Sequence, residues 1–163
     1  MKIIKSILDK ILSVFCIILF AAMVVLVTWQ VITRFIFNDP SAFSEELAKY
    51  CFVWLGLFGA AFLFGENGHM AMDFVKDRFP KPLRLGVELF IQLVIIAFAA
   101  LVLLKGGGNA AQLAMNQINP SLHLPMGYLY AGIAASGVFI IFYAVNCIYL
   151  ILTKKQTLEE QQQ

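Results

Sequence analysis

The chain has 163 residues, of which 61% are hydrophobic and only 13% are charged, whereas ordinary soluble domains carry about 25% charged residues. With a mean hydropathy of +0.83, it has too few polar side chains to cover a water-soluble fold. The net charge is only +2 and no basic run is longer than Lys154-Lys155, which excludes nucleic-acid binding. We therefore expect an all-α integral membrane protein with four transmembrane helices.

The first predicted span covers residues 11–33, between Lys10 and Arg34. A helix needs about 20 apolar residues to cross a bilayer, and this stretch carries no charge. The residues before it are amphipathic, because apolar side chains recur at helical spacing while three lysines and Asp9 take the other face. We expect this start to lie in the cytoplasmic interface as part of an uncleaved first span, since the apolar run is too long for a cleavable signal peptide.

The second predicted span covers residues 42–65 and starts before its charge-free stretch. Ser41 is a suitable N-cap, and Glu45 and Glu46 then lie near the positive end of the helix dipole. The first turns should therefore project beyond the hydrocarbon. We expect Gly65 and Gly68 to end this helix.

The third predicted span covers residues 83–105 and the fourth covers residues 125–152. Gly106-Gly107-Gly108 weakens the end of the third helix, because glycine in a helix costs roughly 1 kcal/mol relative to alanine. Propensity does not decide whether this helix bends there or continues to Met115. Asn119-Pro120 predicts a turn, and Pro125 suits the first position of the last helix.

The orientation follows from the distribution of lysine and arginine, which accumulate on the cytoplasmic side of membrane proteins. Nine of the 12 basic residues fall on one side of the predicted spans. They are Lys2, Lys5, Lys10, Lys76, Arg78, Lys81, Arg84, Lys154 and Lys155, against Arg34, Lys49 and Lys105 on the other side. We expect cytoplasmic N- and C-termini, one transmembrane domain over residues 1–153, and a polar cytoplasmic tail over residues 154–163.

The sequence offers little for catalysis or for cofactor binding. The three cysteines stand far apart without a C-x-x-C pair, and no nucleophile motif or phosphate-binding loop is present. Glu66, His69 and Asp73 have a metal-ligand spacing, but a local cap or a partner contact is the favoured interpretation. Glu88, near the start of the third span, is explained by an interfacial ion pair with Arg84. We predict no enzyme activity and no catalytic, cofactor-binding or metal residue.

A solute site within the chain is also not predicted. Transporters commonly combine an internal repeat with interrupted helices that meet at the bilayer midplane, and the first two spans do not resemble the last two. Two pairs of small residues, Gly56 with Ala60 and Gly132 with Ser136, have the spacing that permits close helix approach. Such pairs also arise by chance in a chain rich in glycine and alanine. The absence of a repeat and of interrupted helices favours a chain that serves as a partner of another membrane protein over one that carries a solute by itself.

The segment from Thr28 to Phe74 is the most specific part of the sequence. It contains Arg34-Phe35, Ser44 to Tyr50 (SEELAKY), Phe52 to Ala61 (FVWLGLFGAA) and Gly68 to Asp73 (GHMAMD). These motifs resemble the small, DctQ-like membrane subunit of the tripartite ATP-independent periplasmic (TRAP) transporters of bacteria and archaea. The resemblance extends to chain length, four spans and cytoplasmic termini.

The resemblance implies a multi-pass protein of the bacterial inner membrane with two protein partners besides the lipid bilayer. One is a large membrane subunit that holds the sodium and substrate sites and forms a stable heterodimer with the small one. The other is a periplasmic binding protein that delivers an organic acid, such as a sialic acid or a C4-dicarboxylate, and docks transiently. The small subunit would serve as a scaffold without a transport site.

We predict a partner interface that combines the charged start of the second span with its small-residue face and the loop that follows. Its members are Arg34, Glu45, Glu46, Lys49, Trp54, Gly56, Ala60, His69 and Asp73. Helix capping and solvation are the competing interpretation for Glu45 and Glu46. His69 and Asp73 would be cytoplasmic and able to fix the loop against the large subunit.

The alternative hypothesis is a stand-alone small four-span exporter that acts as a homodimer. Exporters of the small multidrug-resistance kind are shorter and carry a glutamate in the first span, where this chain has none. A quinone-linked disulfide oxidase would need periplasmic cysteine pairs, which are absent.

Overall fold

The computed structural model describes residues 2–76 and 81–160, with side chains over residues 4–66 and 86–153. The described part is helical, apart from its connections and an isolated antiparallel bridge between Ile118 and Pro125. The elements are α1 (Lys2–Phe35), α2 (Ala42–Lys76), α3 (Lys81–Phe98), the π-helical segment η1 (Ala99–Gly106), α4 (Gly107–Ala114) and α5 (Gly127–Glu160). Within the described residues, four stretches are long and apolar enough to cross a membrane: Ile4–Phe35, Ala42–Glu66, Gly86–Ala114 and Gly127–Thr153. The expected all-α, four-span fold is confirmed.

Helix α1 is continuous from its amphipathic start into its apolar stretch. At 1.5 Å per residue, its 34 residues span about 51 Å, well beyond the hydrocarbon thickness of about 30 Å. The first turns pack on the rest of the molecule: Leu12 is buried with Ala61 and Tyr143, and Tyr143 Oη donates a 2.6 Å hydrogen bond to Asp9. The start of α1 is therefore attached to α2 and α5.

Helix α2 begins as predicted and ends later than predicted. The side chain of Ser41 accepts a hydrogen bond of 3.4 Å from the amide of Ser44, which confirms the N-cap. The expectation that Gly65 and Gly68 end the helix was wrong, because α2 continues to Lys76. Glycine costs only about 1 kcal/mol in a helix and stops it reliably only with a positive φ. None of the described glycines has a positive φ.

The three glycines at 106–108 do not break the third span. The helix passes from α3 through η1 into α4, so Lys105 lies inside the span and not at its end. Gly107 is buried, and a Cβ atom there would lie 2.9 Å from Cγ2 of Ile133 and 3.0 Å from the amide nitrogen of Ala134. Gly107 thus lets α4 approach the backbone of α5 closely.

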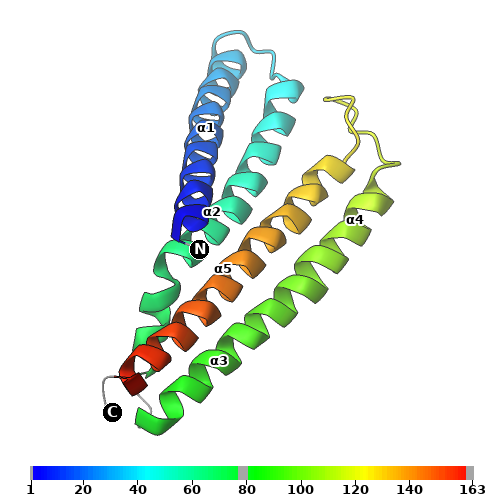
Figure 1. Cartoon of the computed structure of the whole chain (residues 1–163). Coiled ribbons are helices and arrows are strands. Elements are labelled where there is room, and N and C mark those ends of the chain that lie inside the picture. The colour runs from blue at the N-terminus through cyan, green and yellow to red at the C-terminus, as the bar shows by residue number, and fades with distance from the viewer. Residues whose placement is uncertain (1, 77–80, 161–163) are drawn as a thin grey trace.

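The helices form an open row rather than a closed bundle (Figure 1). α1 packs on α2, α2 packs on α5, and α5 packs along α3, η1 and α4. Between the two ends of this row, α1 has no comparable contact with α3, η1 or α4 among the described residues. The α1–α2 connection and the α4–α5 loop lie at the same end of the row, called here the loop end (Figure 1).

Candidate functional site

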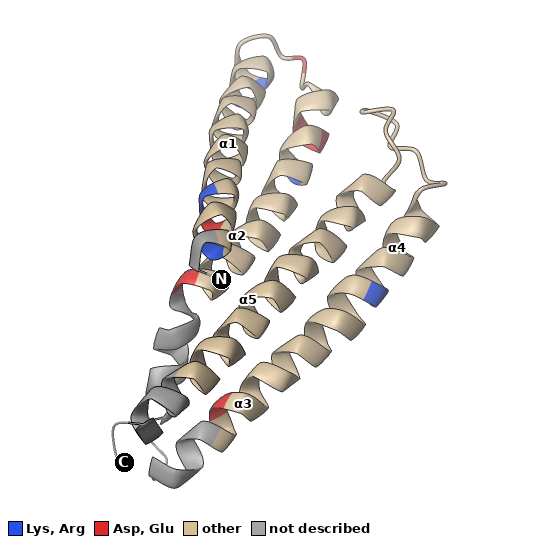
Figure 2. Cartoon of the chain, viewed as in Figure 1, with Lys and Arg blue, Asp and Glu red and all other residues tan. Residues whose placement is uncertain are grey.

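Charged residues gather on α2 at the loop end (Figure 2). Lys49 forms ion pairs with both neighbouring carboxylates, at 3.0 Å to Glu45 and 2.8 Å to Glu46. Their side chains differ in exposure, 61% for Glu45 and 27% for Glu46. Arg34, in the last turn of α1, is exposed. Exposed charged residues, among them Arg34, Glu45 and Lys49, are therefore available to a partner at this end.

Glu46 has a partner inside the chain that the sequence did not reveal. Asn119 donates a 2.8 Å hydrogen bond from Nδ2 to Glu46 Oε2. Asn119 is only 1% exposed, and its Oδ1 accepts the amides of Ser121 and Leu122 at 2.9 and 3.2 Å. Asn119 was predicted only as part of a turn, and that turn chemistry is the one signal that marks it. Glu46 therefore connects α2 to the α4–α5 loop.

Trp54 lies in the seam between α1, α2 and α5. Its ring packs against Phe15 and Phe58, with centroids 6.2 and 6.0 Å away, and Phe58 packs edge-on against Phe139 of α5 at 5.9 Å. Its Nε1 donates a 3.3 Å hydrogen bond to the carbonyl of Leu129. Trp54 therefore belongs to the internal packing of the chain.

Gly56 and Ala60 lie on an exposed face of α2, away from the seam that holds Trp54. A Cβ atom at Gly56, or at the nearby Gly59, would meet nothing within 4 Å. Trp54, predicted as part of the same partner interface, lies on a different side of α2, because two residues along a helix correspond to about 200° of rotation. The described chain leaves this small-residue face uncovered.

The second pair of small residues serves the internal packing. A Cβ atom at Gly132 would lie 2.8 Å from Nε1 of Trp54. Ser136 is buried, with its hydroxyl donating to the carbonyl of Ile133 at 2.8 Å. The sequence singled out Gly132 only for its spacing to Ser136 and gave no sign of Phe139, since the role of both residues depends on Trp54 being turned inward.

The fold also places three further polar residues of the spans, Gln30, Glu88 and Gln92. Gln30 donates a 2.9 Å hydrogen bond to the carbonyl of Ser44, which joins α1 to the start of α2. Glu88 and Gln92 are buried on α3, with exposures of 6% and 0%. The side chain of Arg84, expected to pair with Glu88, lies outside the described residues, as do those of His69 and Asp73.

An open apolar groove of about 330 Å³ runs between α1 and α2. Its lining carries no charged residue: Ser13, Cys16, Ile17, Phe20, Leu55 and Phe62. A carboxylate would lose its hydration there without gaining an ionic partner. Among the described side chains, no three His, Cys, Asp or Glu residues are placed to hold a metal ion.

The fold and these sites define a multi-pass membrane protein whose exposed faces suit protein and lipid contacts. The chain belongs to the DctQ component family of the tripartite ATP-independent periplasmic transporters, whose model matches residues 23–154. The predicted family is thereby confirmed. It follows that the chain is a transporter subunit of the bacterial inner membrane and not an enzyme.

Individual relatives agree with this assignment. The sialic acid TRAP transporter small permease protein SiaQ of Vibrio cholerae is 26% identical over 152 residues, which cover 93% of this chain and 87% of that protein. A putative TRAP transporter small permease protein of Haemophilus influenzae is 28% identical over 140 residues, 86% of each chain. The sialic acid TRAP transporter permease protein SiaT of Haemophilus influenzae is 32% identical over 77 residues, 47% of this chain and 12% of SiaT.

Proposed function

We propose that the chain is the scaffold subunit of a sodium-driven TRAP transporter that imports an organic acid. It forms a stable heterodimer with the large membrane subunit, keeps both termini in the cytoplasm, and has no transport site of its own. The observation that carries this proposal is the open row of helices. Such a row leaves a broad apolar surface that extends a platform in the bilayer, against which the transport domain of a large subunit moves.

The comparisons support the partner and the class of substrate. A 77-residue segment similar to this chain occupies 12% of the permease protein SiaT, so a small-subunit-like segment and a larger permease are found in one polypeptide. Two relatives are named for sialic acid, which is a carboxylate. A sialic acid or another organic acid, such as a C4-dicarboxylate, is therefore the proposed substrate class.

The loop end supports a transient contact with the periplasmic binding protein. Glu45 and Arg34 are exposed there, while Glu46 is held by Asn119 and Lys49. Exposed charges steer association and set orientation more than they add affinity. We assign the docking contact to Glu45 and Arg34, with Lys49 beside them.

The small-residue face of α2 supports a contact with the large subunit. Gly56 and Ala60 allow a neighbouring helix to approach closely, and no side chain of the described chain fills the space at Gly56. His69 and Asp73 follow on the same helix toward its far end, and we assign them to the cytoplasmic part of the same contact.

Reconstitution in liposomes tests the proposed function. With the large subunit and the loaded binding protein present, uptake of the organic acid should require both a sodium gradient and this chain. The chain alone should neither bind nor accumulate the acid. Uptake by the chain alone would refute the scaffold role. Isolation of the chain from native membranes as a homodimer without a large partner would support the exporter hypothesis instead.

A further inference from the structure

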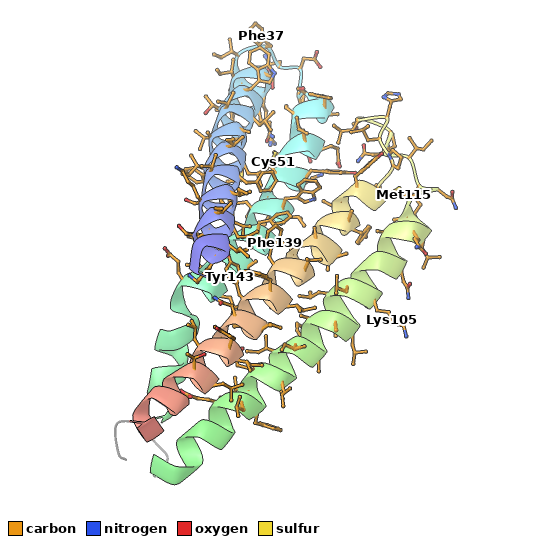
Figure 3. The ribbon with its side chains drawn as sticks, in the orientation of Figure 1. Phe37, Cys51, Lys105, Met115, Phe139 and Tyr143 are labelled. Carbon is orange, nitrogen blue, oxygen red and sulfur yellow. The ribbon has the colours of Figure 1, made fainter. Side chains whose placement is uncertain are left out.

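A stripe of polar side chains runs along the outer face of α4 and the turn on either side of it. Lys105, Asn109, Gln112 and Asn116 recur at spacings of four, three and four residues, and all four are exposed. The opposite face of α4 is buried at Gly107, Ala111 and Ala114. Figure 3 shows Lys105 pointing away from α5. We call these four residues the α4 polar stripe.

The α4 polar stripe begins within a helix that is long and apolar enough to cross a membrane. Lys105 lies nine residues before the end of the span Gly86–Ala114, a distance of about 13 Å along a helix. Gly107 packs against Ile133 of α5, and Gly132 packs against Trp54 of α2. Trp54 is about two helical turns from Glu46, which marks the charged start of α2. Lys105 therefore lies at about the same level along the helix row as the aromatic cluster of Trp54, Phe15 and Phe58.

Lipid chains offer no hydrogen-bond partner to the polar side chains of the stripe. A cation at the bilayer centre costs about 2.5–3.5 kcal/mol on insertion scales. The side chain of lysine can extend toward the headgroups, but those of Asn109 and Gln112 are too short to follow it. Exposed leucines flank the stripe, Leu101 at 65% and Leu113 at 76%, so the surroundings are apolar. A partner with hydrogen-bonding groups at membrane depth is required.

The depth and charge of the stripe select among the partners. A soluble binding protein does not reach two helical turns below the charged end of α2. A second copy of this chain that paired stripe against stripe would bring only amides and another cation, because the α4 polar stripe contains no carboxylate. The large membrane subunit spans the same bilayer and is free to supply an acceptor. A carboxylate facing Lys105 would form a charge-assisted hydrogen bond there.

The backbone beside Lys105 leaves room for such a partner. Gly108 has nothing within 4 Å of an added Cβ atom, and Gly106 is exposed. Glycine is unfavourable in a helix, and at these two positions the described chain makes no close contact that requires it. Lys105 also lies in the last turn of the π-helical segment η1, an irregularity that occurs frequently at functional sites.

We infer that the α4 polar stripe is a contact surface for the large membrane subunit, with a carboxylate of that subunit accepting a hydrogen bond from Lys105. Polar side chains of the large subunit, or its backbone, pair with Asn109 and Gln112. This inference rests on the proposed function, because it needs the large subunit as partner. It adds a polar contact at the end of the helix row farthest from α1.

Photocrosslinking in membranes that contain all three components tests the inference. A photoreactive phenylalanine analogue replaces Gln112, and a control replaces Val25, an exposed α1 residue at 67%. Mass spectrometry should identify the large subunit in the Gln112 adduct, at a yield at least tenfold above that from Val25. An equal or lower yield, or an adduct with lipid, the binding protein or a second copy, overturns the inference.

Charge substitutions at Lys105 provide an independent measurement. K105E should reduce co-purified large subunit roughly tenfold, which corresponds to about 1.4 kcal/mol, and K105R should retain it. K105L distinguishes a lipid contact from a protein contact at this position. A leucine that faces lipid would leave the complex intact, whereas a leucine that faces the large subunit would weaken it. A wild-type chain that recovers no large subunit refutes the proposed function itself. A wild-type complex that K105E and K105L leave intact refutes only the α4 contact.

Discussion

At the residue scale, two glycines with the same sequence signature have opposite environments. Gly56 with Ala60 and Gly132 with Ser136 both match the small-residue spacing, yet only Gly132 is packed, against Trp54. The reason is the direction of Trp54, which donates to the carbonyl of Leu129 and fills the seam with Phe15 and Phe58. Spacing identifies a residue that permits close approach, whereas the fold decides whether the neighbour belongs to the same chain.

Replacing each of these two glycines with leucine should therefore have a different effect. Gly132→Leu forces a side chain into Trp54, and overpacking of this kind costs about 1–3 kcal/mol, so the melting temperature of the isolated subunit in detergent should fall. Gly56→Leu enters open space and should leave that temperature unchanged while reducing co-purification of the large subunit. Equal melting temperatures for both variants would contradict the packing of Gly132, and normal assembly of Gly56→Leu would remove its face from the interface.

At the element scale, signals between neighbouring residues predicted the helices. Contacts between residues far apart in the sequence determine how the helices and their connections pack. Ser41 was identifiable as an N-cap because its bond reaches only three residues ahead. The partner of Glu46 was not identifiable, because Asn119 lies 73 residues away in the sequence. The glycines at 106–108 were undecided for the same reason, since Gly107 is explained only by Ile133 and Ala134 of α5.

The contact between Glu46 and Asn119 makes the α4–α5 loop depend on α2. Glu46→Ala removes an acceptor from the buried Asn119, whose Oδ1 holds the amides of Ser121 and Leu122. Hydrogen–deuterium exchange of the peptide covering residues 117–126 should become several-fold faster, because an unsatisfied buried donor costs about 1–3 kcal/mol. Glu45→Ala is the matched control, with the same loss of one ion pair to Lys49 and unchanged exchange of the loop. Faster exchange in both variants would assign the effect to the ion pairs.

At the scale of the whole molecule, the open row leaves two distinct ends. α1 is attached mainly to α2, with its first turns reaching α5 through Asp9 and Tyr143, while α4 carries a polar outer face. A closed four-helix bundle would bury both of these edges. An open row presents them to lipid or to another protein, which is the geometry expected of a subunit that completes a larger membrane assembly.

The orientation of the row is tested by thiol labelling. Lys105 lies within the stretch Gly86–Ala114, so the count of basic residues becomes nine on the terminal side against Arg34 and Lys49 at the loop end. The positive-inside rule therefore predicts a periplasmic loop end. In a variant without Cys16, Cys51 and Cys147, Asn38→Cys and Gln117→Cys should react with an impermeant maleimide in intact spheroplasts. Lys76→Cys should react only after lysis, and its labelling in intact spheroplasts would reverse the topology and with it the assignment of Glu45 and Arg34 to binding-protein docking.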